Sequence, residues 1–427
     1  MLRTERDDDW REWMAMNEGK LPTRVHFLYG GSPAFASGAG VMQNGMVDVL
    51  RREGHSVRVD IIDSLELADA FVAEMEQPPM VPPAATGRQG GDIVVVVDGI
   101  ALLFLHAHLA WLRDASCAPW LRGSVAIVHV PFSSDPTYLR ERWVREAVPG
   151  EHADFAAEVR AREVRCFGAV SRVLAVACEG ALGAYGVGAE RLLVTSPADD
   201  SWKPATTLPR RRPCAKRGPA AAGAGEGEGE GGSGVGGGAF VTVGTLCARK
   251  NQLVLLEALA LLRDGELPSD WRLHVVGEAA AEPGYAAQLR AAAEGFAGHV
   301  VLHGALPQAE SFALMARCDA FLFPSRSESF GMAADEAVRI GLPVVAFRGV
   351  GPVAALLPPS ASVLVADAAD GRQWANALRL CCAQLPALQA AAAAEADRRE
   401  ERAGADRREQ LPLAQAIHEL VARPRRA

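Results

Sequence analysis

Two acidic residues lie eight positions apart between Pro324 and Phe347, in the segment PSRSESFGMAADEAVRIGLPVVAF. Glu328 comes just after an apolar, strand-like run, AFLF, which ends at the proline. Open parallel α/β sheets bind ligands at the carboxyl ends of their strands, so this loop is a candidate binding site. Gly331 allows close backbone approach, and the helix expected after it offers unpaired N–H groups and a positive dipole end. The segment therefore predicts a phosphate-binding loop beside a carboxylate.

Glu336 lies within the predicted helix. Its three- and four-residue spacing places it on one helix face with Ala333, Ala337 and Ile340. A carboxylate among apolar neighbours needs a hydrogen-bond donor, because leaving it unpaired is costly, and vicinal ribose hydroxyls would serve. An acid near a helix N-terminus that is stabilised by the helix dipole explains the residue about equally well. Both interpretations stay open.

A second candidate site follows another strand-like run, in VTVGTLCARKNQ. Arg249 and Lys250 are expected where a small-residue turn meets the next helix. Two cations at a strand edge could clamp a diphosphate and neutralise a departing leaving group. A solvated surface pair is the commoner reason for adjacent Arg and Lys residues, and this alternative stays open too.

The first half of the chain offers a glycine-rich loop and a histidine. The loop YGGSPAFASGAG, which contains Gly38, precedes a helical pattern but does not match G-x-G-x-x-G. Its flexible backbone could line an interdomain cleft, although a plain loop explains the glycines nearly as well. His129 ends the run SVAIVH, which places an imidazole at a strand edge. A hydrogen-bonded structural histidine is an alternative of similar weight.

Alternating strands and helices are expected to position these residues. The strand-like runs are RVHFLY, SVRVDII, DIVVVV, SVAIVH, RVLAV and RLLVT in the first half, and FVTV, WRLHVV, HVVLH, AFLF, PVVAF and SVLV in the second. Helical patterns separate them, as is typical of parallel sheets covered on both faces. One such helix is expected to stop at Gly54. The predicted fold class is α/β, with two Rossmann-like domains.

The chain is predicted to have five parts. Its 427 residues exceed what one hydrophobic core normally organises. A middle segment rich in Gly, Ala and Glu cannot bury enough apolar surface to offset its ordering entropy, which indicates a flexible linker or insertion. A phosphate-cradling glycine loop is the less favoured interpretation, because such loops are short. The parts are an N-terminal extension (1–21), a first domain (22–206), the linker (207–238), a second domain (239–384) and a helical tail (385–427).

Charge and cysteine content exclude several classes of protein. A formal net charge of -8 argues against nucleic-acid binding, which requires clustered Lys and Arg in excess. The eight cysteines contain no C-x-x-C pair, so zinc-site or disulfide spacing is missing, and reduced thiols fit a cytoplasmic location. The N-terminus lacks a secretory signal and no apolar run is long enough to span a bilayer. Any membrane contact is therefore expected to be peripheral.

The motif GTLCARKN, followed about eighty residues later by PSRSESFGMAADEAVRIGLPVVA, resembles the retaining glycosyltransferases of family 4. The resemblance covers roughly residues 24–382, and in the first half it rests on VVVVDGIAL, IVHVP and the order of elements. It implies a GT-B fold, in which an N-terminal acceptor domain and a C-terminal nucleotide-sugar domain face each other across a cleft. A final helix often crosses back. The implied reaction transfers a sugar from a nucleoside diphosphate to an acceptor hydroxyl with retention of anomeric configuration.

By motif position, the resemblance gives each candidate residue a role. Glu328 would contact the donor sugar, Glu336 the ribose hydroxyls, and His129 would lie near the transferred sugar. Thr245 stands where many relatives carry arginine, so Arg249 would have to supply that charge instead. The groups implied at the phosphates are Arg249, Lys250, Gly38 and the backbone N–H groups of Phe330, Gly331 and Met332.

The resemblance implies no cofactor and no required metal. The expected partners are a nucleotide-sugar donor and an acceptor that is a glycan, a lipid or a small molecule. Two other classes of function stay open. One is a GT-B enzyme of another reaction type, such as a nucleotide-sugar epimerase or a phosphorylase. The other is a non-catalytic protein that binds nucleotide sugars or acts as a scaffold.

Overall fold

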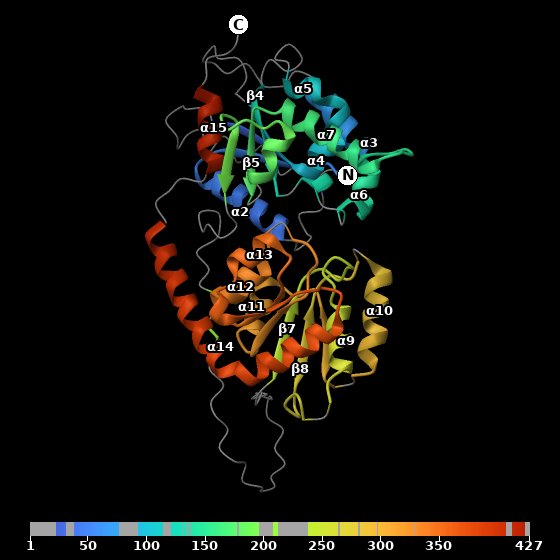
Figure 1. The fold of residues 1–427 in the computed structure, drawn as a ribbon. Helices are drawn as coiled ribbons and strands as arrows, with labels where there is room; N and C mark the ends of the chain where they lie inside the picture. The colour runs from blue at the N-terminus through green and yellow to red at the C-terminus, as the bar shows by residue number, and fades with distance from the viewer. Residues whose placement is uncertain are drawn as a thin grey trace, which may run out of the picture. The chain divides into compact units, whose positions relative to one another are not determined.

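The computed structural model divides the chain into two units, and each is described by itself (Figure 1). Among the described residues, one unit contains 23–30, 40–195 and 412–422, and the other contains 38–39 and 208–406. The extension predicted over 1–21 and most of the linker predicted over 207–238 lie outside the described residues. The structure describes residues 23–30, 38–76, 93–113, 121–129, 131–134, 136, 138–176, 179–195, 208–211, 238–263, 265–280, 282–296, 298–328, 330–406 and 412–422.

The first unit contains a parallel sheet with strand order β2-β1-β3-β4-β5-β6. Its strands are β1 (Arg24–Tyr29), β2 (Ser56–Ile61), β3 (Ile93–Asp98), β4 (Leu121–Val128), β5 (Arg172–Val176) and β6 (Leu192–Thr195). Every residue of β3 is buried, as expected for a strand that is covered on both faces. Alternate residues such as Val95 and Val97 pack with α3, α4, α5 and α7, while α15 packs against β3, β4, β5 and β6.

The helices of the first unit follow the predicted alternation. They are α2 (Gly38–Arg52), α3 (Leu65–Glu76), α4 (Gly99–Phe104), α5 (Leu109–Arg113), α6 (Arg142–Ala147), α7 (Phe155–Ala169), α8 (Glu179–Leu182) and α15 (Pro412–Ala422). Short 3-10 helices cover Leu105–His108, Phe132–Ser134, Tyr138–Arg140 and Gly183–Tyr185. Gly54, with a φ of 88°, lies just after α2 and confirms the predicted glycine stop.

The second unit contains another parallel sheet, with strand order β12-β11-β10-β7-β8-β9. Its strands are β7 (Ala239–Val243), β8 (Arg272–Val276), β9 (Val300–Gly304), β10 (Ala320–Phe323), β11 (Val344–Phe347) and β12 (Ser362–Val365). Neighbouring residues of one strand enter different cores: Phe240 packs in one apolar cluster and Val241 in the other. This alternation explains why the strands read as continuous apolar runs.

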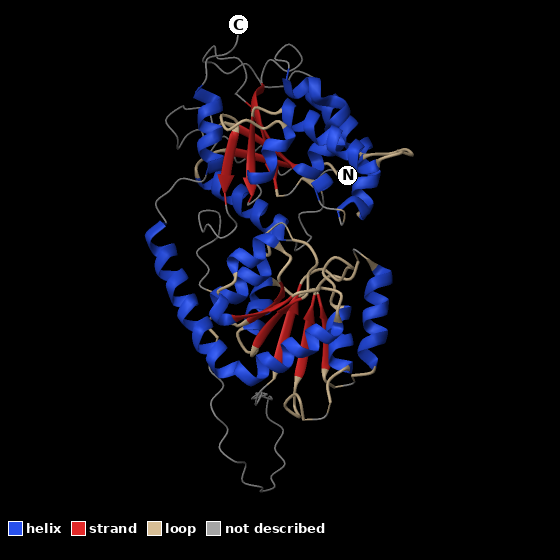
Figure 2. Cartoon of the chain, in the orientation of Figure 1, coloured by secondary structure: helices blue, strands red, loops and turns tan. Residues whose placement is uncertain are grey.

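The helices of the second unit lie on both faces of that sheet (Figure 2). They are α9 (Leu253–Ala260), α10 (Pro283–Glu294), α11 (Gln308–Met315), α12 (Met332–Ile340), α13 (Gly351–Leu356) and α14 (Gly371–Asp406), with a 3-10 helix over Pro359–Ala361. Helix α14 packs against α9, α12 and β12, and it runs through the predicted boundary between 384 and 385. Within the described ranges, no helix combines the length and apolar character needed to cross a bilayer.

All twelve predicted strands are present, with ends that differ by one or two residues, except that β4 begins three residues earlier than predicted. The α/β fold class with two Rossmann-like halves is confirmed. The apolar runs were decisive because central strands such as β3 and β10 are buried on two faces, so few other structures can accommodate such a pattern.

Buried histidines should make stability depend on pH. Burial, reinforced by the charges of Arg58 and Arg24, lowers the pKa of His26 from 6.5 to about 4. Between these values the unfolded chain binds a proton that the folded chain does not, so this contribution to stability is lost as the pH falls from about 6.5 toward 4. In His26→Gln, we expect the free energy of unfolding to decline less between pH 7.5 and pH 5 than in the wild type.

Urea denaturation at the two pH values measures this difference. His152→Gln is the control, because His152 is only partly buried and its imidazole bonds the Pro149 carbonyl. That variant should follow the wild type. An equal decline in His26→Gln and wild type would contradict the assignment.

Candidate active site

The turn between β7 and α9 carries the predicted cations and is fixed by its own side chains. Gln252 donates from Nε2 to the Thr245 carbonyl at 3.0 Å and to the Gly244 carbonyl at 3.3 Å. The Gln252 side chain is buried. Thr245 is half-buried and contributes its backbone to this turn, at the carboxyl end of a central strand. The turn therefore holds a defined shape where an α/β sheet binds ligands.

Asn251 ties this turn to the loop after β10. It has a φ of 59°, in the left-handed region that asparagine tolerates better than most residues. Its buried side-chain amide donates to the Pro324 carbonyl at 3.2 Å and to the Ala368 carbonyl at 2.8 Å. Asn251 was not predicted as a functional residue, and its only signal in the sequence is an asparagine two residues before a helix. Its hydrogen bond to Pro324 holds the turn after β7 beside the loop after β10.

The two predicted motifs meet through ion pairs. Lys250 Nζ lies 2.5 Å from Glu328 Oε1, and Arg249 Nη1 lies 3.5 Å from Glu328 Oε2. Arg249 Nη1 also donates to the Ser327 carbonyl at 3.1 Å. The exposed fractions of the side chains are 8% for Glu328, 16% for Lys250 and 20% for Arg249. The solvated surface pair considered for Arg249 and Lys250 is therefore wrong: both cations serve a buried carboxylate.

The surrounding charges keep Glu328 ionised. Burial alone would raise its pKa, but the charges of Lys250 and Arg249 and hydrogen bonds from Lys250 and Ser325 outweigh it, so the pKa lies below the ordinary value. Glu328 is consequently a hydrogen-bond acceptor rather than a proton donor near neutral pH. It is suited to accept bonds from hydroxyl groups.

The N-terminus of α12 follows this carboxylate. Gly331 is the N-cap residue, with a φ of 90°, a conformation that favours glycine. Phe330, just before it, is buried, and Met332 is the first helical residue. N–H groups in the first turn of a helix lack acceptors within the helix, so they can donate to an anion. The predicted anion-binding groups and the Lys250–Glu328 pair thus belong to one loop-helix segment.

The acids of α12 differ from the sequence-based interpretation. Glu336 is only partly buried, whereas its neighbour Asp335 has 2% of its surface exposed. Helical spacing predicted apolar surroundings for Glu336. Helix α14 packs against a second side of α12, however, and Asp335 lies on that side. The deeply buried acid of this helix is Asp335, which was not singled out from the sequence.

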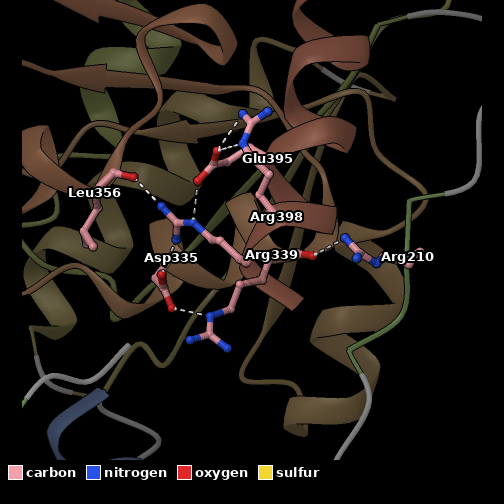
Figure 3. Close-up of polar contacts among 7 residues, drawn as sticks. Arg210, Asp335, Arg339, Leu356, Glu395 and Arg398 are labelled. Atoms are coloured by element: carbon pink, nitrogen blue, oxygen red, sulfur yellow. Dashed lines mark hydrogen bonds and ion pairs between the residues drawn. The ribbon is translucent and has the colours of Figure 1, made fainter. Parts of the chain in front are cut away.

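Asp335 clamps α12 to α14 (Figure 3). Its Oδ2 accepts from Arg339 Nε at 2.9 Å and its Oδ1 from Arg399 Nη1 at 2.5 Å. Arg399 also donates to the Leu356 carbonyl at 2.5 Å and to Glu395 Oε1 at 3.1 Å. One guanidinium therefore joins α12, α14 and the end of α13. This network fixes the orientation of the helix whose N-terminus faces the candidate site.

In the first unit, polar side chains gather at the carboxyl ends of the strands. Asp98, the last residue of β3, accepts from Gly30 N at 2.8 Å and from Ala101 N at 2.7 Å. The buried Gln43 side chain also hydrogen-bonds Asp98 and lies 3.4 Å, Nε2 to Nε2, from His129. Gln43 and Asp98 were not singled out from the sequence. They connect His129 to the framework of the sheet.

His129 follows β4 directly and is half-buried. Burial lowers its pKa from 6.5 to about 4, so the imidazole is neutral at physiological pH. It can donate or accept a hydrogen bond but brings no positive charge. Gly38 is the first residue of α2, while the preceding residues 31–37 of the glycine-rich loop lie outside the described residues.

The structure thus gathers Arg249, Lys250 and Glu328 into one contact cluster. Glu336 and Met332 belong to the adjoining helix α12, and Phe330 and Gly331 come immediately before it. Thr245 belongs to the adjoining turn. His129 follows β4 of the first sheet, and Gly38 is the first residue of α2. Cations, helix N–H groups and an ionised carboxylate at one sheet edge can bind a phosphorylated ligand that also carries hydroxyl groups.

Residues 237–384 match the family model of the glycosyl transferases group 1. No curated protein sequence gives a significant match. Among solved structures, sucrose-phosphate synthase from Thermosynechococcus elongatus superposes with a TM-score of 0.62 and 14% identity, over 94% of this chain and 99% of that one. HepE from Anabaena, solved with UDP and glucose, has a TM-score of 0.60 and 16% identity, over 93% and 100%. The starch synthase IV catalytic domain from Arabidopsis thaliana, bound to ADP and acarbose, has a TM-score of 0.56 and 12% identity, over 94% and 99%.

The chain has the GT-B fold. Two parallel six-stranded sheets and the likeness to these structures confirm the predicted fold class. The family model covers the segment that contains Arg249, Lys250, Glu328 and Glu336. In this GT-B protein, therefore, the second unit carries both the sequence match and the ion-pair cluster.

Removing the carboxylate of the α12 clamp should destabilise the protein. Asp335→Ala leaves Arg399 and Arg339 without their buried partner, and breaking such a pair typically costs about 3 kcal/mol or more. Asp397→Ala is the matched control, because Asp397 is 72% exposed and pairs with Arg210 at the surface. Its loss should cost well under about 1 kcal/mol. Urea denaturation measures both, and similar losses in the two variants would contradict a buried clamp.

Proposed function

We propose that this protein is a retaining glycosyltransferase of family 4, which moves a hexose from a nucleoside diphosphate sugar to an acceptor hydroxyl. The observation that carries the proposal is the cluster of Lys250, Arg249 and Glu328 beside the N-terminus of α12. The match of residues 237–384 to the glycosyl transferases group 1 supports it. Structures of the same fold contain UDP with glucose, or ADP, which supports a nucleotide-sugar donor.

The cations and the helix N-terminus suit the departing diphosphate. As the bond to the sugar breaks, negative charge develops on the diphosphate, and preorganised cations stabilise it more than they stabilise the ground state. Lys250 and Arg249 supply this charge. We assign the backbone N–H groups of Phe330, Gly331 and Met332 to the phosphates as well. Thr245 and Gly38 would line the same phosphates.

The carboxylates and the histidine suit the sugar and the ribose. Because its pKa is lowered, Glu328 stays ionised and accepts hydrogen bonds from sugar hydroxyls rather than protonating the leaving group. Glu336 would accept from the ribose hydroxyls. Neutral His129 would hydrogen-bond the transferred sugar. We propose front-face attack, in which the donor phosphate takes the acceptor proton, so that neither a cofactor nor a metal ion takes part in the transfer.

The acceptor is a glycan, a lipid or a small molecule. We expect the enzyme to act in the cytoplasm, with peripheral membrane contact if the acceptor is a lipid. Added Mg²⁺ should leave the transfer rate unchanged, because the charge on the diphosphate is neutralised by side chains.

A panel of UDP-, GDP- and ADP-sugars, assayed by release of nucleoside diphosphate with a mixture of cellular acceptors, tests the proposal. Lys250→Ala and Glu328→Gln should each lower kcat/KM at least about 100-fold, the usual scale for losing one preorganised electrostatic contact. Arg290→Ala is the control, because this exposed cation on α10 should leave activity unchanged.

Other outcomes would select the rival functions. Release of an epimerised sugar nucleotide without consumption of acceptor would identify an epimerase. Calorimetry that detects no binding of any sugar nucleotide to the wild type would leave a scaffold role and overturn the proposal.

A further inference from the structure

Three potential metal ligands converge in the first unit, outside the residues assigned to sugar transfer. Glu53, His55 and His418 each offer one ligand atom, and these atoms all lie within 4.8 Å of one another. The ring centroids of the two histidines are 5.2 Å apart. The residues come from two segments more than 350 positions apart in the sequence. Folding has therefore brought two imidazoles and a carboxylate together.

The turn after α2 presents the first two of these side chains. Glu53 N and Gly54 N donate to the Val49 and Arg51 carbonyls, each at 3.0 Å, so the turn is held by the end of the helix. Because Gly54 adopts a φ of 88°, the chain reverses there and leads into β2. Glu53 and His55 thus flank a fixed glycine turn rather than a loose loop.

The third side chain comes from α15. His418 is exposed on this helix, whose buried residues include Ile417 and Leu420. Arg122 Nη2, at the start of β4, donates to the Val421 carbonyl at 3.2 Å, and Arg172, at the start of β5, pairs with Glu419 at 3.4 Å. The helix is therefore docked where strands of the first sheet begin. His55, which precedes β2, lies at this same amino edge.

The burial of His55 itself points to a ligand. The residue is only 9% exposed, and its Nε2 atom is buried without a hydrogen-bond partner. A buried polar atom without a partner costs about 1–3 kcal/mol, so native structures usually satisfy such atoms with protein, water or an ion. An ion bound among His55, His418 and Glu53 would satisfy the imidazole.

The ligand chemistry and the ring separation both fit zinc. Zn²⁺ accepts imidazole nitrogen at about 2.0–2.1 Å and carboxylate oxygen at about 2.0–2.2 Å, usually in tetrahedral geometry. Two imidazoles bound in this way hold their ring centroids roughly 5 Å apart. Glu53 and His418 are exposed, so their side chains can close the remaining distance by changing rotamer. Mg²⁺ is a poor candidate, because it prefers oxygen ligands.

We propose that Glu53, His55 and His418 bind one Zn²⁺ ion, which fastens α15 to the first sheet. Two histidines and one carboxylate leave a fourth position for water. The site lies at the amino edge of the sheet, whereas His129 and Asp98 lie at the carboxyl edge where ligands of α/β sheets bind. At this edge the ion would supplement the docking contacts of an eleven-residue helix.

Titration calorimetry and thermal unfolding of the full chain, stripped with a chelator and desalted, test the site. The wild type should bind one equivalent of Zn²⁺, and Zn²⁺ but not Mg²⁺ should raise the midpoint of thermal unfolding. His418→Ala should weaken Zn²⁺ binding at least tenfold and abolish the thermal shift. Because His418 is exposed, the variant is expected to fold. Glu53→Gln should weaken binding as well.

Two control variants distinguish loss of a zinc ligand from a general effect of substitution. Glu419→Gln changes the next residue of α15 without removing a ligand and should keep the wild-type affinity. His303→Ala removes the pair formed by His274 Nδ1 and His303 Nε2, 3.0 Å apart in the second unit, and should keep it too. Absence of Zn²⁺ binding in the wild type, wild-type affinity in His418→Ala, or loss of binding in His303→Ala would each overturn the proposal.

Discussion

The candidate site depends on one electrostatic balance, the neutralisation of a buried carboxylate by two cations. Glu328 would be costly to bury as an anion, and Lys250 and Arg249 would repel each other without it. Each motif therefore needs the other. Asn251 makes this contact possible. It lies in the turn after β7, and its side-chain amide donates to the Pro324 carbonyl in the loop after β10. The charge that holds the two motifs together is also the charge that a diphosphate would engage.

Longer-range contacts set the direction of the helix beside that cluster. Asp335 faces α14 while the N-terminus of the same helix follows the Glu328 loop, so α12 is anchored on one side and available on the other. Arg399 extends the anchor to the Leu356 carbonyl. A substitution in α14 could thus misplace N–H groups at the start of α12 without touching them.

The framework was predictable from the sequence because its central strands are short apolar runs buried on two faces. Arg249, Lys250 and Glu328 were predictable because each lies in a short sequence motif that follows a predicted strand. Asp335 was not, since its partner Arg399 is sixty-four residues away and helical spacing alone pointed to Glu336. Gln43 and Asn251 escaped for a related reason: an amide shows its importance only through the groups it bonds. Single-sequence patterns reveal which face is apolar, but not which distant side chain completes a polar network.

Helix α15 closes the first sheet with residues from the far end of the chain. Ile417, Leu420 and their neighbours cover apolar strand surface that residues 24–195 alone leave open. During synthesis, domains generally begin to fold as they leave the ribosome, N-terminal ones first. The first unit of this protein must instead wait, with part of its apolar surface uncovered, until the whole second unit has been translated. Its final assembly is thereby a late event, coupled to the synthesis of α15.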